Sequence, residues 1–143
     1  MKTIPLPHSR SKVLTKGLPA PAKPAIDVEL IAALDPLARN DSYVYVHCYL
    51  KNEWQDALVR IWKTTFLVDN GGSRSGLVHA ENITFAPIWT LIPDRAKHSF
   101  LLIFDALPKG CTQFDLVEEI PQPGGFHVTD IQRNQQDVYH IDL

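Results

Sequence analysis

Cysteines and long apolar runs are scarce in this chain. Its 143 residues include only two cysteines, Cys48 and Cys111. Two cysteines are too few for a disulfide framework, so we expect free thiols. Apolar runs fall well short of the roughly 18 residues that a membrane helix needs. We therefore expect no membrane partner.

A secretory signal is also missing from the first residues. Pro5, Pro7 and His8 interrupt the apolar stretch that such a signal requires. With Met1 as the natural start, this predicts a cytoplasmic protein.

Sequence patterns that mark common catalytic centres are absent as well. There is no G-x-S-x-G, no G-x-x-x-x-G-K-[ST] and no G-x-G-x-x-G. The six histidines show no H-x-H or H-E-x-x-H spacing, and the cysteines form no C-x-x-C. We expect neither a cofactor nor a metal, and these missing patterns favour a non-enzymatic protein over an enzyme.

The net charge of −2 argues against a general nucleic-acid binder. This average hides an asymmetry between two parts of the chain. Residues 1–26 carry five basic residues and no acidic one, whereas the remainder has nine Lys or Arg against sixteen Asp or Glu, a net of −7. Residues 1–25 also hold five of the eleven prolines, which remove amide donors and exclude a central strand. We expect a proline-rich basic arm over 1–25 and one domain over 26–143.

Strand patterns dominate that domain. Phe100 to Phe104 is an unbroken apolar run, typical of a strand covered on both faces. The turn residues from Leu107 to Gly110 follow, and a second strand is expected from Gln113 to Glu119. We interpret this pair as the central hairpin.

The remaining expected elements are shorter. Residues 26–34 fit either a strand or a short helix, and we favour a strand. Further strands are expected over 43–50, 57–63 with an extension to 68, 77–85, 126–131 and 137–143, the last two as a hairpin. Turns are expected at 39–42 and 69–72, and 89–96 is expected to be a connection. The pattern predicts an all-β fold, an immunoglobulin-like antiparallel sandwich of about seven or eight strands.

Residues 43–50 alternate clearly, with aromatic side chains on one face. Val44, Val46, Cys48 and Leu50 fall on the core side, as do Ala57, Val59 and Ile61 of the next strand. The opposite face carries the candidate ligand-binding residues Tyr43, Tyr45, His47, Tyr49, Arg60 and Trp62. We expect these to form a single aromatic face. Exposed, it would be a platform for sugar rings or a partner protein; covered by the arm, which we favour, it would be a second small core.

The cysteines and histidines offer weaker candidates. Cys48 is expected to be a buried small hydrophobe, whereas Cys111 lies in a turn and is expected to be exposed and oxidisable. If the last two strands form a regular hairpin, His127 and His140 point to opposite faces, and a one-residue bulge would reverse this.

Three stretches carry a resemblance: VRIWKTTFLVDNGG at 59–72, LVHAENI at 77–83 and FLLIFDALPKGCTQFDLVE at 100–118. Their order resembles small β-sandwich domains of uncharacterised bacterial proteins, which occur alone or beside thioredoxin-like or peptidase modules. The resemblance covers roughly residues 26–143 and implies the fold. It implies no activity, because no C-x-x-C and no Cys/His pair accompanies these motifs.

The leading hypothesis is a non-enzymatic protein-binding or interaction module, with self-association as one form of that interaction. The first alternative is a carbohydrate-binding module, which requires at least two exposed, coplanar rings among Trp54, Trp62, Trp89 and the tyrosines. The second alternative is a metal-dependent enzyme. It requires a cleft that joins His127 or His140 to Asp130, Asp137 or Asp142.

Overall fold

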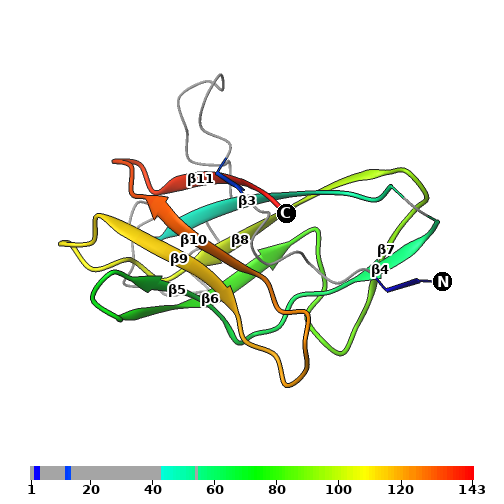
Figure 1. Cartoon of the computed structure of the whole chain (residues 1–143), viewed down its shortest axis with the longest axis horizontal. Coiled ribbons are helices and arrows are strands. Elements are labelled where there is room, and N and C mark those ends of the chain that lie inside the picture. The colour runs from blue at the N-terminus through cyan, green and yellow to red at the C-terminus, as the bar shows by residue number, and fades with distance from the viewer. Residues whose placement is uncertain (1, 4–11, 14–42, 54) are drawn as a thin grey trace, which may run out of the picture.

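The computed structural model describes residues 2–3, 12–13, 43–53 and 55–143. These residues form eleven strands and no helix, which confirms the predicted all-β class. Figure 1 shows how the strands are arranged. No helix able to cross a membrane occurs in this part of the chain. The strands are β1 (Lys2–Thr3), β2 (Lys12–Val13), β3 (Val44–Lys51), β4 (Ala57–Val59), β5 (Thr65–Asp69), β6 (Arg74–Glu81), β7 (Thr90–Ile92), β8 (Lys97–Phe104), β9 (Gln113–Glu118), β10 (His127–Gln132) and β11 (Val138–Asp142).

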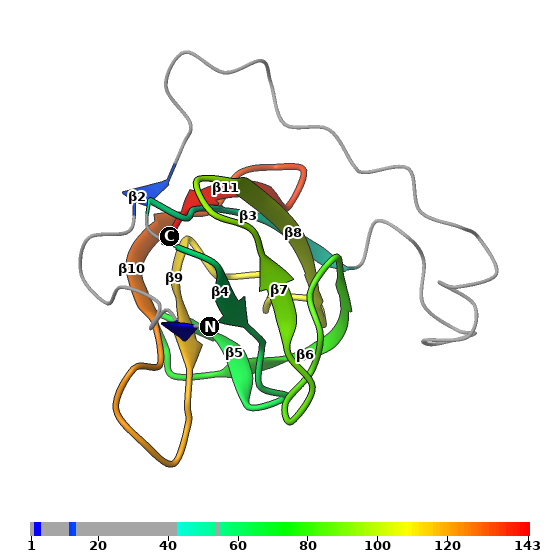
Figure 2. The ribbon, with the colours of Figure 1, turned by 90° about the vertical axis from the view of Figure 1, so that its right-hand side faces the viewer.

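Eight strands form one curled sheet in the order β10-β9-β5-β6-β8-β3-β11-β2. The second sheet, β1-β4-β7, lies towards one end of this curl, as Figure 2 shows. The sheets are mixed, because β3 pairs in parallel with β11, and β1 with β4. The expectation of antiparallel pairing throughout is therefore wrong.

The main core lies inside the curl. Alternate residues of β3 point into it, because successive side chains of a strand face opposite ways. Val44, Val46 and Cys48 are fully buried there, and Leu50 nearly so. The predicted inner face of this strand is thus confirmed, as is the burial of the three predicted core residues Ala57, Val59 and Ile61.

Strand β8 is covered on both faces over Phe100 to Phe104, as its apolar run predicts. Phe100, Leu102 and Phe104 belong to the main core. Leu101 and Ile103 point outward and belong to a second, smaller cluster. This strand therefore anchors packing on both sides of the sheet.

Both predicted hairpins of the second half are wrong. Strand β8 pairs with β3 and β6, whereas β9 pairs with β5 and β10. The chain between β8 and β9 crosses from one part of the curled sheet to another, and it buries Leu107 and Cys111 on the way. Strand β11 likewise leaves β10 and pairs with β3. The alternation of apolar and polar residues along a strand predicts which side chains are buried, but it does not predict which strand lies next to it.

The turn predicted at 69–72 is confirmed. It joins the antiparallel strands β5 and β6, and Gly72 takes a positive φ of 90° that glycine adopts without strain. Asp69 Oδ1 accepts hydrogen bonds from the backbone N–H groups of Gly71 (3.0 Å) and Ser73 (2.6 Å). An aspartate carboxylate thus shapes this turn.

Strand β7 was expected to be part of a connection, and this is wrong. Thr90 to Ile92 pair antiparallel with β4. The strand expected over 57–63 is shorter than predicted, since β4 ends at Val59. The expected elements at 26–34 and 39–42, and most of the arm, lie outside the described residues.

Candidate functional site

The outer face of β3 is buried at its beginning and opens towards its end. Tyr43 is 3% exposed and Tyr45 fully buried, and both pack with Leu101, Ile103 and Val138. His47 and Tyr49 are half-buried. The predicted second small core therefore exists at Tyr43 and Tyr45; the arm expected to cover it lies largely outside the described residues.

His47, Tyr49 and His140 form a polar cluster where this face opens. His47 and His140 are direct partners on β3 and β11, and their rings stack at a centroid distance of 4.9 Å. Tyr49 Oη shares a hydrogen bond of 2.7 Å with His140 Nδ1. This bond engages one ring nitrogen of His140 and fixes the orientation of its imidazole.

Burial favours the neutral forms of the three side chains in this cluster. Desolvation lowers the pKa of His47, and the neighbouring His140 lowers it further. Desolvation also lowers the pKa of His140 and raises that of the Tyr49 hydroxyl. The cluster offers hydrogen bonds and ring surface, but no fixed charge.

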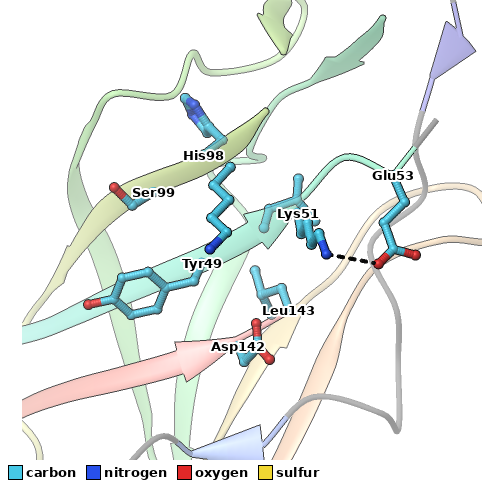
Figure 3. A pocket seen from close by; sticks show the side chains of 9 residues that line it. Tyr49, Lys51, Glu53, His98, Ser99, Asp142 and Leu143 are labelled. Carbon is cyan, nitrogen blue, oxygen red and sulfur yellow. Dashed lines mark ion pairs between the residues drawn. The ribbon is translucent and has the colours of Figure 1, made fainter. Parts of the chain in front are cut away.

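A groove of about 680 Å³ begins beside Tyr49, where β3, β8 and β11 end or begin. In Figure 3, Tyr49 and Lys51 of β3 lie between His98 and Ser99 of β8 on one side and Asp142 and Leu143 at the end of the chain on the other. Its lining residues are Tyr49, Leu50, Lys51, Glu53, Lys97, His98, Ser99, Asp142 and Leu143. This volume lies within the range of sites that hold a small molecule or a few residues of a peptide.

A second hollow of about 290 Å³ adjoins the first. It is lined by His47, Tyr49, Glu81, Asn82, Ser99, Phe100 and Leu101. Tyr49 and Ser99, which face each other on β3 and β8, line both hollows. The two hollows therefore adjoin each other at these two residues, and we refer to them together as the outer groove.

The outer groove carries charges of both signs. Lys51 and Lys97 are direct partners on β3 and β8. Lys51 Nζ lies 3.6 Å from Glu53 Oε1, the ion pair drawn in Figure 3. Asp142 is the direct partner of Tyr49 on β11, on the other side of β3. The lysine end and the Asp142 side of the groove thus differ in charge.

Arg60 and Trp62 do not join this face, so the expected single aromatic face is wrong. The neighbours of β3 are β8 and β11, whereas Arg60 and Trp62 lie between β4 and β5. The Arg60 guanidinium lies 3.9 Å from the ring centroid of Trp89 and 5.2 Å from that of Trp62. These three residues form a separate cation–π cluster.

A buried carboxyl group adjoins that cluster. Glu118 at the end of β9 is 7% exposed, and its Oε2 accepts a hydrogen bond of 3.2 Å from the backbone N–H of Trp62. Desolvation raises the pKa of Glu118 to about 7, although hydrogen bonds to the backbone of Trp62 and Phe126 and the charge of Arg60 oppose this shift. Glu118 therefore titrates near neutral pH.

The histidines give no metal centre in the described part of the chain. His127 Nε2 lies 3.1 Å from Asp115 Oδ2, on the exposed surface of β10 and β9. His140 is instead bound to Tyr49, and its strand does not pair with β10. Among the described residues, no group of three or more His, Cys, Asp and Glu is arranged to hold a metal ion.

The two cysteines are both buried. Cys48 lies in the core as expected, and burial, with the charge of Glu118, raises the pKa of its thiol. The expectation of an exposed Cys111 is wrong, because it is only 6% exposed. Its Sγ lies 3.3 Å from the carbonyl oxygen of Gln113, and burial raises its pKa as well.

The sequence interpretation found His47 and Tyr49 but missed the rest of the outer groove. Lys97, Ser99 and Asp142 reach it through the pairings of β3 with β8 and β11, and the second pairing is parallel. One signal was present in the sequence: Lys97 to Ser99 form a polar start to a strand that continues as an apolar run. Such a start indicates that the outer face of the strand is exposed to solvent over these first residues.

Comparisons with protein-family models, with curated proteins and with solved structures find no match to this chain. The resemblance to small bacterial β-sandwich domains therefore stays a prediction, and the function rests on the geometry described above.

Proposed function

We propose that this protein is a non-enzymatic interaction module whose outer groove binds an extended segment of a partner protein. The observation that carries this proposal is that two hollows lie next to each other on one face of the sheet and share Tyr49 and Ser99. A trough across several strands suits an extended chain better than a compact ligand.

The floor of the outer groove supports this use. Strands β3 and β8 pair over eight residue positions, so the groove rests on a rigid sheet. Tyr49 is half-buried, and such an aromatic side chain provides contact area at a low cost in conformational entropy. The polar residues around it can bind the backbone of a peptide.

The composition of the groove supports binding as its role. The His140 Nδ1 is engaged by Tyr49, and the charged groups of the groove are spread over its walls. A nucleophile held by a base would be the mark of acyl-transfer chemistry. Here the hydroxyl held by a histidine is that of Tyr49, whose pKa is raised by burial, so it stays protonated and serves better as a hydrogen-bonding group than as a nucleophile.

The carbohydrate alternative has less support. Tyr43 and Tyr45 are buried, Arg60 covers one face of Trp89, and Trp54 lies outside the described residues. A sugar platform needs two exposed rings in one plane, and the described tryptophans are instead joined through Arg60.

Selection from a displayed library of random peptides tests the proposal. The whole chain is immobilised, and enriched peptides are then measured against Ser99→Arg, which fills the outer groove from an exposed position of β8. We expect at least a tenfold loss of affinity. Gln122→Arg, an exposed position in the loop after β9, is the matched control and should bind normally. Enriched peptides that bind Ser99→Arg as well as the natural chain would contradict the proposed site.

A further inference from the structure

Two lysines face each other at one end of the outer groove. Lys51 and Lys97 are direct cross-strand partners, and both are exposed. Like charges directly opposite each other destabilise an antiparallel pair. The fold therefore places two lysines at directly opposed positions of neighbouring strands, where a neutral or acidic residue in place of one of them would be more stable.

The described neighbours neutralise this pair only weakly. Lys51 Nζ lies 3.6 Å from Glu53 Oε1, but both side chains are more than 60% exposed, at 61% and 64%. An ion pair of this kind contributes little to stability. Within the described residues, Lys97 takes part in no ion pair.

Asp142 places a negative charge elsewhere in the same groove. It is the partner of Tyr49 on the neighbouring strand β11, whereas the two lysines are partners on β3 and β8. A ligand with several neighbouring acidic groups would bring one of them close to this carboxylate. The arrangement therefore favours a single negative charge at the lysine end.

We propose that the partner segment carries one acidic side chain, Asp or Glu, whose carboxylate binds between Lys51 and Lys97. The segment then continues over Ser99 and Tyr49. This inference rests on the proposed function and names the chemistry of the ligand. The two lysines would attract an anion at long range, so binding should weaken as salt rises.

The test is a charge reversal combined with peptide selection. The natural chain and Lys97→Glu are each used to select from the same displayed library. We expect the natural chain to enrich peptides with one Asp or Glu at a fixed position. Lys97→Glu should bind those peptides at least tenfold more weakly, and it should enrich Lys or Arg at that position instead.

Two further variants make the result unambiguous. Lys109→Glu changes the net charge equally, but it lies beyond the opposite end of β8. It should select the same peptides as the natural chain. Lys97→Gln removes the charge without reversing it, so it serves if Lys97→Glu does not fold. It should lose affinity for the acidic peptides and gain none for basic ones.

The outcomes separate this inference from the proposed function. Peptides that are blocked by Ser99→Arg, but that have no fixed acid and bind Lys97→Glu normally, would overturn the inference and leave the interaction module standing. No groove-dependent peptide at all would overturn both. Binding of inorganic phosphate at the lysines, with no acidic peptide enriched, would replace the peptide carboxylate with a small anion and would also overturn the inference.

Discussion

Glu118 Oε2 lies 3.2 Å from the backbone nitrogen of Trp62, and this hydrogen bond joins the end of β9 to the chain between β4 and β5. The carboxyl group is buried, and the Arg60 side chain that stacks on Trp62 and Trp89 is close enough to influence its pKa. The contact couples an ionisable group of the interior to a surface cluster of aromatic rings.

Glu118 predicts a loss of stability as pH rises towards neutrality. Its pKa is about 7 in the folded chain, above the value of 4.5 for a free carboxyl group. The folded state therefore holds this proton more tightly than the unfolded state. The resulting stabilisation is complete below pH 4.5 and is lost as pH rises through 7. The difference corresponds to about 3 kcal/mol in the free energy of unfolding.

Glu118→Gln tests this assignment. It keeps an oxygen acceptor for the Trp62 N–H and removes the charge, so we expect about 1 to 2 kcal/mol more stability at pH 8 and little change at pH 4.5. Urea unfolding across this range measures the difference. The adjacent, exposed Glu119 offers the control Glu119→Gln, which should show no gain at pH 8. A Glu118→Gln effect that is independent of pH would contradict the assignment.

For the stacked histidines His47 and His140 we expect the opposite pH dependence: the free energy of unfolding should fall as the pH is lowered. The pKa values of His47 and His140 are both lowered by burial, so the unfolded state binds their protons more readily. The stabilisation is complete above pH 6.5 and is lost as pH falls below it. We expect the double variant His47→Gln/His140→Gln to unfold with a flatter pH dependence below 6.5. A double variant that keeps the pH dependence of the natural chain below 6.5 would contradict this assignment.

Gly125 packs so closely against the backbone of Glu118 that we expect a larger residue at position 125 to destabilise the fold. A Cβ at position 125 would lie 2.2 Å from the backbone oxygen of Glu118, which cannot move aside as a side chain could. We expect Gly125→Ala to lose about 2 kcal/mol or more of unfolding free energy. At Gly110 a Cβ meets nothing within 4 Å, so Gly110→Ala should be neutral or more stable by up to about 1 kcal/mol. Equal thermal stability of the two variants would refute this.

The buried thiols predict low reactivity in the native state. Cys48 and Cys111 are both shielded, and their pKa values are raised, so little thiolate is available at pH 8. We expect both to react with a disulfide reagent at least 100-fold faster in 6 M guanidinium chloride than in buffer. In the variant Cys111→Ser, Cys48 is the remaining thiol, so its labelling rate can be measured by itself. Rapid labelling of one thiol in the folded chain would show that its segment opens locally.

The alternation of side chains predicted burial well. Val44, Val46, Cys48 and Leu50 were placed correctly because apolar residues at a period of two define one face of a strand. The continuous run from Phe100 to Phe104 was also interpreted correctly, because it offers no polar face to water. These are local properties, and the local sequence contains them.

Partner choice between strands was not predicted. The strands β8 and β9 are close in sequence and were expected to pair, yet the connection between them buries Leu107 and Cys111 and carries the chain elsewhere. Burial of these two side chains is a tertiary effect that no pattern of turn residues reveals. The outer groove was missed for the same reason: Lys97, Ser99 and Asp142 meet Lys51 and Tyr49 only through long-range pairings.

The parallel contact of β3 with β11 also bears on how the chain is made. Tyr49 and His140, which this contact brings together, are 91 positions apart. At ordinary rates of translation, roughly 5 to 20 s separate the synthesis of these residues. Throughout that interval the edge of β3 that finally pairs with β11 lacks its neighbour, so this part of the sheet can be completed only when the last residues of the chain have been made.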